Sequence, residues 1–113
     1  FPKSIDRADF TLEVVQGLPP ADAAATLAAF TARGVGTGLA QLPGTPDHLI
    51  VTGGGRKNAF IMDLITRMSG IVPNPTEAYG WDGDAIEAQD FAYMAVRTLK
   101  GLPITFPETT GVS

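Results

Sequence analysis

The fold of this chain is decided at residues 49–58, which read Leu-Ile-Val-Thr-Gly-Gly-Gly-Arg-Lys-Asn. The run at residues 49–52, in which Ile50, Val51 and Thr52 are β-branched, is typical of a short buried strand. Three glycines follow at once and predict a turn, after which Asn58 is suited to cap a helix. The apolar stripe of that helix is formed by Phe60, Ile61, Leu64, Ile65 and Met68. The stretch therefore predicts a strand that enters a glycine turn and continues into a helix.

An earlier helix is expected to begin at Pro19-Pro20, because proline is tolerated in the first helical turn. Its apolar stripe is formed by Ala24, Leu27, Ala28, Thr31, Val35, Leu39 and Leu42. Gly34, Gly36 and Gly38 weaken this helix by about 1 kcal/mol each relative to alanine. Small residues also let a neighbouring element approach closely, so the helix is still expected. Pro-Gly-Thr-Pro at residues 43–46 ends it.

The chain beyond the central helix predicts a short strand and a final helix. Gly70 is placed to end the central helix, and Ile71-Val72-Pro73 is expected to form a strand whose proline puts it at an edge or an end. Asp82 or Asp84 is expected to cap the final helix, and Gly101 to stop it. Its buried stripe is predicted to comprise Ala88, Phe91, Ala92, Ala95 and Leu99.

The order helix, strand, helix, strand, helix predicts an α/β fold with helices packed on a small sheet. Residues 1–18 are expected to form an arm, and residues 19–113 the α/β body. The chain opens at Phe1-Pro2-Lys3 without an initiator methionine and closes at residues 109–113 without a final element. We therefore expect both ends to be cuts through a longer polypeptide.

The composition narrows the class of protein. The chain has 113 residues, of which 44% are hydrophobic, so it has enough apolar material for a core. Its net charge of −4 and scattered basic residues argue against a nucleic-acid partner. No apolar stretch is long enough to span a bilayer, and the absence of cysteine excludes disulfides and thiolate metal sites. A cytoplasmic protein is the default expectation.

The central candidate site is the glycine triplet Gly53, Gly54 and Gly55 at the junction of strand and helix. Residues without side chains let a ligand lie directly on the backbone, and ligands of open α/β sheets bind beyond the carboxyl ends of the strands. The helix that follows favours phosphate at its N-terminus. The alternative is a tight turn that merely requires glycine. The triplet fits neither the Walker A pattern nor the dinucleotide pattern.

Acidic residues form a second cluster, comprising Asp82, Asp84, Glu87 and Asp90. Asp84 and Glu87 are expected to share a helix face, which allows an acid/base or metal role, whereas the alternative is capping and helix-dipole complementation. Glu87 borders the apolar stripe and could project into a cleft. His48 is expected at the surface, and Tyr79 and Trp81 either stack on a sugar or pack their loop down.

Four stretches of this sequence, taken together, resemble the anhydro-N-acetylmuramic acid kinases. The matching stretches are Pro2-Lys3-Ser4 with Arg7 and Phe10, Ala25-Thr26-Leu27 with Thr31-Ala32, Gly53-Gly54-Gly55 with Asn58, and residues 79–89 with Phe91-Ala92, Gly101-Leu102-Pro103 and Thr109-Thr110-Gly111. The last of these is the most specific, and the order of the four is that of the family.

The resemblance implies that the chain is the C-terminal part of the ribonuclease-H-like nucleotide-binding lobe of an actin-like, two-lobed sugar kinase. Such a kinase uses ATP and Mg²⁺ to convert anhydro-N-acetylmuramic acid into N-acetylmuramic acid 6-phosphate in cell-wall recycling. The resemblance places Gly53, Gly54 and Gly55 at the nucleotide, with Asn58 fixing the turn, and Glu87 at the sugar. The family's phosphate loop and water-activating aspartate precede this segment, so neither catalytic residues nor metal ligands are expected here. The isolated chain is therefore predicted to be inactive without the N-terminal part of its parent.

Two other classes remain open at this point. One is a non-catalytic nucleotide-binding or interaction module, such as a chaperone-like ATPase lobe. The other is a structural α/β fragment that forms a homodimer through surface normally covered by its missing half. ATP binding without sugar dependence would favour the first, and concentration-dependent light scattering the second.

Overall fold

The computed structural model describes residues 9–110 and confirms the α/β class. Its elements in chain order are η2 (Glu13–Val15), α1 (Pro20–Leu39), β1 (Leu49–Val51), η3 (Gly54–Lys57), α2 (Ala59–Ser69), β2 (Pro73–Pro75), η4 (Thr76–Tyr79), α3 (Ile86–Leu99) and α4 (Pro107–Thr110). The chain divides into two compact units, one of which is Val15–Ile86. The other joins Phe1–Val14 to Glu87–Ser113. The family-like residues Pro2, Lys3, Ser4, Arg7 and Gly111 lie outside the described residues.

The sheet of the Val15–Ile86 unit consists of β1 and β2, which pair in parallel. Leu49 is opposite Pro73, and Val51 is opposite Pro75. Because the strands are parallel, both carboxyl ends lie at the same edge, where a ligand is usually bound in open α/β sheets. The segments that follow the two strands therefore start side by side.

The second strand begins two residues later than the predicted Ile71-Val72-Pro73. The backbone of Ile71 is bound to the end of α2 instead, because its N–H donates to Ser69 Oγ (3.1 Å) and its carbonyl accepts from the same hydroxyl (3.2 Å). Gly70 ends α2 in the left-handed conformation (φ 74°), as predicted. This turn delays the strand until Pro73.

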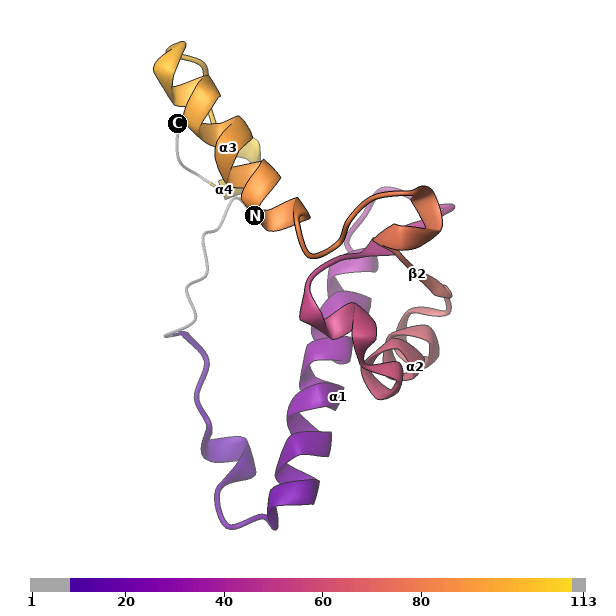
Figure 1. Ribbon diagram of the computed structural model, residues 1–113. Helices are drawn as coiled ribbons and strands as arrows, with labels where there is room; N and C mark the ends of the chain where they lie inside the picture. The colour runs from indigo at the N-terminus through magenta and orange to yellow at the C-terminus, as the bar shows by residue number, and fades with distance from the viewer. Residues whose placement is uncertain (1–8, 111–113) are drawn as a thin grey trace. The chain divides into compact units, whose positions relative to one another are not determined.

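Helices α1 and α2 lie side by side in the Val15–Ile86 unit (Figure 1). A Cβ atom at Gly36 would lie 2.9 Å from the carbonyl oxygen of Met68, so the absence of a side chain allows this close approach. Ala32 and Ile65 are the buried apolar residues of the described core. The glycines of α1 are thus compatible with the helix, as predicted, and one of them is required by its packing.

The first helix ends at Leu39 and does not reach the predicted Leu42. The N–H of Gln41 donates to Gly38 and that of Leu42 to Leu39, so the last turn tightens into three-residue hydrogen bonds. Leu42 is about half exposed as a result. The spacing of apolar residues in the sequence therefore continues to Leu42, although the helix ends at Leu39.

The final helix, α3, forms where it was predicted but does not bury its predicted stripe. No residue of α3 is buried, and Phe91 and Leu99 are 62% and 87% exposed. Gly101 follows the helix in the left-handed conformation (φ 63°), as predicted. The guanidinium of Arg97 donates to the carbonyl of Pro103 (2.7 Å) and holds the turn beyond the helix. Among residues 9–110, no helix has both the length and the apolar character needed to cross a membrane.

Candidate functional site

The glycine turn, which comprises Gly53, Gly54 and Gly55, lies at the carboxyl edge of the sheet and is exposed. Gly53 has φ 70° and ψ −177°, a backbone conformation that is essentially restricted to glycine. A Cβ atom built on any of the three glycines would meet no other atom within 4 Å. The turn is therefore open, which the hypothesis of a ligand on the backbone requires.

Asn58 caps α2, as predicted. Its side-chain oxygen accepts from the N–H groups of Phe60 (3.0 Å) and Ile61 (3.2 Å). The N–H of Asn58 in turn donates to the carbonyl of Gly55 (3.0 Å). Asn58 thus provides an acceptor for two unpaired N–H groups in the first turn of α2, and its own N–H closes the end of the glycine turn.

Arg56 is the buried charge of this region, and its side chain is only 3% exposed. Its guanidinium contacts Glu77 through Nη2 (2.6 Å) and Nε (2.8 Å), and Asp84 through Nη2 (2.9 Å). The remaining nitrogen, Nη1, donates to the carbonyl of Gly53 (2.8 Å). Lys57 also binds Asp84 (2.7 Å). We call these four side chains, Arg56, Lys57, Glu77 and Asp84, the arginine cluster.

The arginine cluster keeps its carboxylates ionised. The bonds from Arg56 lower the pKa of Glu77 to about 2. The bonds from Lys57, and then from Arg56, lower the pKa of Asp84 below its ordinary value. The bond to Glu77 raises the pKa of Arg56. The buried guanidinium is thus compensated by two anions, as a buried charge requires.

A tight contact at Gly83 holds the segment after β2 against the cluster. A Cβ atom at Gly83 would collide with the Arg56 guanidinium and the Thr76 hydroxyl. Thr52 donates to the carbonyl of Gly83 (3.3 Å). Thr76 itself is buried and donates to Glu77 (3.3 Å). Thr52 and Arg56, which follow β1, therefore bind Gly83 and Glu77, which follow β2, and these contacts join the two segments.

The predicted acidic cluster is divided by the structure. Asp84 lies before α3, where its carboxylate binds Arg56 and Lys57, so it neither caps α3 nor shares a helix face with Glu87. The carboxylate of Asp82 accepts from the N–H of Asp84 (3.0 Å) and forms a local turn. Glu87 lies exposed in the first turn of α3, in the second unit. The proposed sugar contact at Glu87 stays a prediction.

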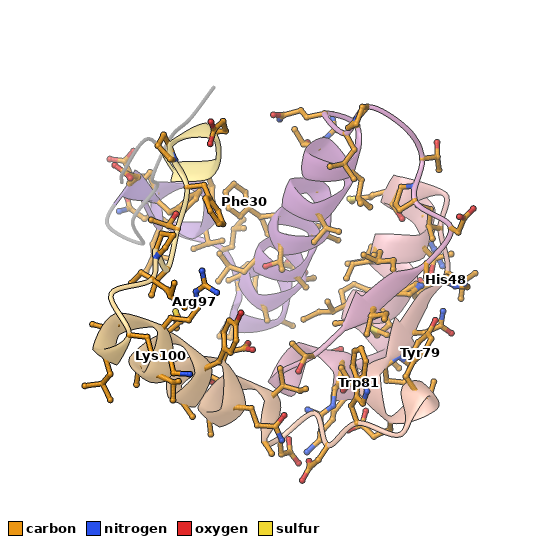
Figure 2. All side chains as sticks on the ribbon, turned by 90° about the horizontal axis from the view of Figure 1, so that it is seen from above. Phe30, His48, Tyr79, Trp81, Arg97 and Lys100 are labelled. Atoms are coloured by element: carbon orange, nitrogen blue, oxygen red, sulfur yellow. The ribbon has the colours of Figure 1, made fainter. Side chains whose placement is uncertain are left out.

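His48 lies just before β1, at the surface as predicted, and its ring approaches that of Tyr79, which follows β2 (Figure 2). The hydroxyl of Tyr79 lies 3.3 Å from His48 Nδ1, and their rings meet edge to face at 6.2 Å. The ring of Trp81 lies 6.0 Å from that of Tyr79. Tyr79 and Trp81 are 39% and 51% exposed, so they contact each other and keep part of their surface in water.

A cavity of about 180 Å³ lies elsewhere in the same unit. Its lining residues are Gly36, Leu39, Ala40, Thr45, Pro46, Met68, Ser69 and Ile71. These residues surround the C-terminal end of α2, whereas the glycine turn precedes the N-terminal end. An 11-residue helix is about 16 Å long. The cavity is therefore a separate feature, and none of the predicted site residues lines it.

Sequence reasoning missed Arg56, Lys57 and Glu77. Arg56 and Lys57 belong to the junction of strand and helix, but no sequence pattern assigns either of them a role, and none marks Glu77. Arg56 is separated from Glu77 by 21 residues and Lys57 from Asp84 by 27. Such spacings carry no local signal, because only the parallel pairing of β1 and β2 brings these segments together. In the described part of the chain, no three His, Cys, Asp or Glu side chains are grouped to hold a metal ion.

Comparison with known proteins gives consistent matches over nearly the whole sequence. The family described as anhydro-N-acetylmuramic acid kinase matches residues 2–113. A protein of that name from Rhizorhabdus wittichii is 58% identical over 99% of this chain and 31% of its own length. Those of Rhizobium rhizogenes and Rhodospirillum rubrum are 53% and 54% identical over 99% and 97% of the chain, and 30% and 29% of their own lengths. No solved structure matches. The chain thus spans about a third of the length of these relatives.

Proposed function

Because this chain belongs to the anhydro-N-acetylmuramic acid kinase family, we propose that it forms part of the nucleotide-binding lobe of such a kinase. The observation that carries the proposal is the open glycine turn at the carboxyl edge of a parallel sheet. Bare backbone at this edge suits a nucleotide, whose phosphate and ribose oxygens accept from main-chain N–H groups. A ribonuclease-H-like lobe, and a C-terminal place in the parent kinase, stay predictions.

The proposed parent reaction transfers a phosphate from ATP to anhydro-N-acetylmuramic acid while water opens the anhydro ring. The product is N-acetylmuramic acid 6-phosphate, which enters cell-wall recycling in the cytoplasm. In this chain, Gly53, Gly54 and Gly55 contact the nucleotide, and Asn58 fixes the turn. Glu87 is the proposed contact to the sugar.

Magnesium accompanies ATP in phosphoryl transfer, where it neutralises phosphate charge and needs one or two carboxylates. Asp84 is bound to Arg56 and Lys57, so we assign it no metal contact. The role proposed for this chain is to bind and orient the nucleotide. Positioning alone does not replace the groups that activate water, which we place in the rest of the kinase.

The proposal is tested by comparing the full-length parent kinase with the 113-residue chain. Each is incubated with ATP, Mg²⁺ and anhydro-N-acetylmuramic acid, and the sugar phosphate is measured by mass spectrometry. We expect product from the parent and none from the isolated chain. A parent that binds ATP but forms no sugar phosphate would instead favour a non-catalytic nucleotide-binding module. Turnover by the isolated chain would overturn the proposal that this chain binds the nucleotide while the rest of the kinase activates water.

A further inference from the structure

We infer that Arg56 is a positioning residue of the nucleotide site, and that it acts by fixing the peptide group between Gly53 and Gly54. The inference rests on the proposed function, because it names a residue that prepares the glycine turn for its ligand. Arg56 itself is buried and engaged by protein groups, so it is not a nucleotide contact. Its effect on the nucleotide is exerted through the backbone of Gly53.

The carbonyl of Gly53 accepts two hydrogen bonds from one residue. The main-chain N–H of Arg56 lies 3.3 Å away, and the side-chain Nη1 lies 2.8 Å away. The shorter bond comes from a guanidinium, and bonds from charged donors are about twice as strong as neutral ones. Gly53 has no Cβ, so conformations with positive and negative φ are both open to it and its neighbouring peptide groups can adopt several orientations; the one observed has φ 70°. The side chain of Arg56 selects one orientation among them.

Fixing this carbonyl also fixes the N–H of Gly54. The two groups belong to one planar peptide, and no described peptide bond is cis. In a trans peptide the carbonyl and the N–H point in opposite directions. With the carbonyl of Gly53 directed at Arg56, the N–H of Gly54 is directed away from it. A flip of this peptide would instead present a carbonyl, which repels phosphate.

The guanidinium can hold the peptide only because it is itself held. Glu77 binds two of its nitrogens, Nη2 and Nε, and Asp84 binds Nη2, so two carboxylates fix the plane of the side chain. Gly83 leaves no room for the guanidinium to shift toward it. A lysine keeps the charge but cannot reach three partners with one fixed plane. The geometry therefore requires arginine and not merely a cation.

The test uses the full-length parent kinase and the variant Arg56→Lys. We expect kcat/KM for ATP to fall about tenfold, because a bond to a charged group is lost at a site prepared for the nucleotide. The KM for the sugar is expected to change by less than about twofold, since no sugar contact is altered. The matched control is Arg67→Lys, which changes an exposed arginine paired with Asp63 on α2 and should leave both constants unchanged.

Hydrogen exchange separates positioning from a general loss of structure. In Arg56→Lys, we expect faster exchange in peptides covering residues 50–57 and unchanged exchange in peptides of α1. Equally faster exchange in both regions would show a merely structural role and overturn the inference. Glu77→Gln gives a milder variant, which keeps an oxygen acceptor and should show the same pattern with a smaller loss. Unchanged kcat/KM for ATP in both variants would also overturn it.

The outcomes distinguish this inference from the proposed function. If ATP fails to slow exchange at residues 50–57 of the unmodified kinase, the nucleotide does not bind at the glycine turn and both ideas fail. If ATP slows exchange there but Arg56→Lys keeps the ATP kinetics of the unmodified kinase, only the role of Arg56 fails. If ATP slows exchange at residues 50–57 and Arg56→Lys lowers kcat/KM for ATP without changing the KM for the sugar, both the proposed function and the role of Arg56 are supported.

Discussion

Two nitrogens of the Arg56 guanidinium bind one carboxylate oxygen of Glu77: Nη2 lies 2.6 Å and Nε 2.8 Å from Oε1. The arginine is buried and the glutamate is half exposed. The two residues follow different strands, so their contact ties together the carboxyl ends of the parallel pair. An exposed ion pair contributes little to stability, but removing the carboxylate from a buried guanidinium leaves an uncompensated charge.

The Arg56–Glu77 contact predicts a loss of stability in acid. Arg56 lowers the pKa of Glu77 in the folded protein to about 2, from an ordinary value of 4.5. A lowered pKa stabilises the folded state above pH 4.5, and that contribution disappears as the pH falls toward 2. The unfolding midpoint should therefore fall between pH 5 and pH 2.5 by less in Glu77→Gln than in the unmodified protein. Asp47→Asn, in the exposed loop before β1, is the control, and an equal fall in all three proteins would contradict the prediction.

A side chain at Gly83 should destabilise the protein. The Cβ of Gly83→Ala would collide with Arg56 and Thr76, and forcing extra atoms into a packed site costs about 1–3 kcal/mol. Gly44→Ala is the matched control, because a Cβ there meets nothing within 4 Å. Denaturant unfolding of both variants measures the difference. Equal free energies of unfolding for the two variants would show that Arg56 and Thr76 move aside for the added methyl group without loss of stability.

The close approach of α1 and α2 predicts opposite effects for two glycines of one helix. Gly36→Ala places a Cβ 2.9 Å from the Met68 carbonyl and should destabilise the protein by about 1–3 kcal/mol. Gly34→Ala meets nothing within 4 Å and should stabilise the helix by about 0.5–1 kcal/mol. The unfolding temperature of each variant, compared with that of the unmodified protein, shows whether the substitution stabilises or destabilises it. A stabilising Gly36→Ala would mean that the helices separate easily.

The cap of α2 predicts a difference between alanine and aspartate at position 58. Asn58→Ala removes the acceptor for Phe60 and Ile61 and should cost about 1 kcal/mol. Asn58→Asp keeps an oxygen in place and should retain most of the stability. Chemical denaturation of both variants tests this. If aspartate is as harmful as alanine, Asn58 acts through its amide nitrogen and not as a cap.

The sequence was informative where local chemistry determines the structure. The strand before Gly53, the cap at Asn58 and the left-handed Gly70 each depend on residues close in sequence, and each was predicted correctly. The predicted burial of the strand was wrong, because Leu49 and Val51 are only partly buried and Ile50 is 37% exposed. The predicted burial of Phe91 and Leu99 was wrong, because an apolar period shows which face of a helix could be covered and not whether anything covers it. The partnership of Arg56 with Glu77 was missed, since it depends on the pairing of two strands and on no spacing within the sequence.

The central claim, that the glycine turn holds the nucleotide, is tested most directly by the KM for ATP of Gly54→Ala in the full-length parent kinase. Gly54 does not have a positive φ, and a Cβ there meets no protein atom within 4 Å, so folding and the unfolding midpoint should be preserved. A nucleotide lying on this backbone would meet the added methyl group, and even a small misplacement is costly. We predict a KM for ATP raised about tenfold or more at an unchanged unfolding midpoint. An unchanged KM for ATP in a stably folded variant would contradict the account.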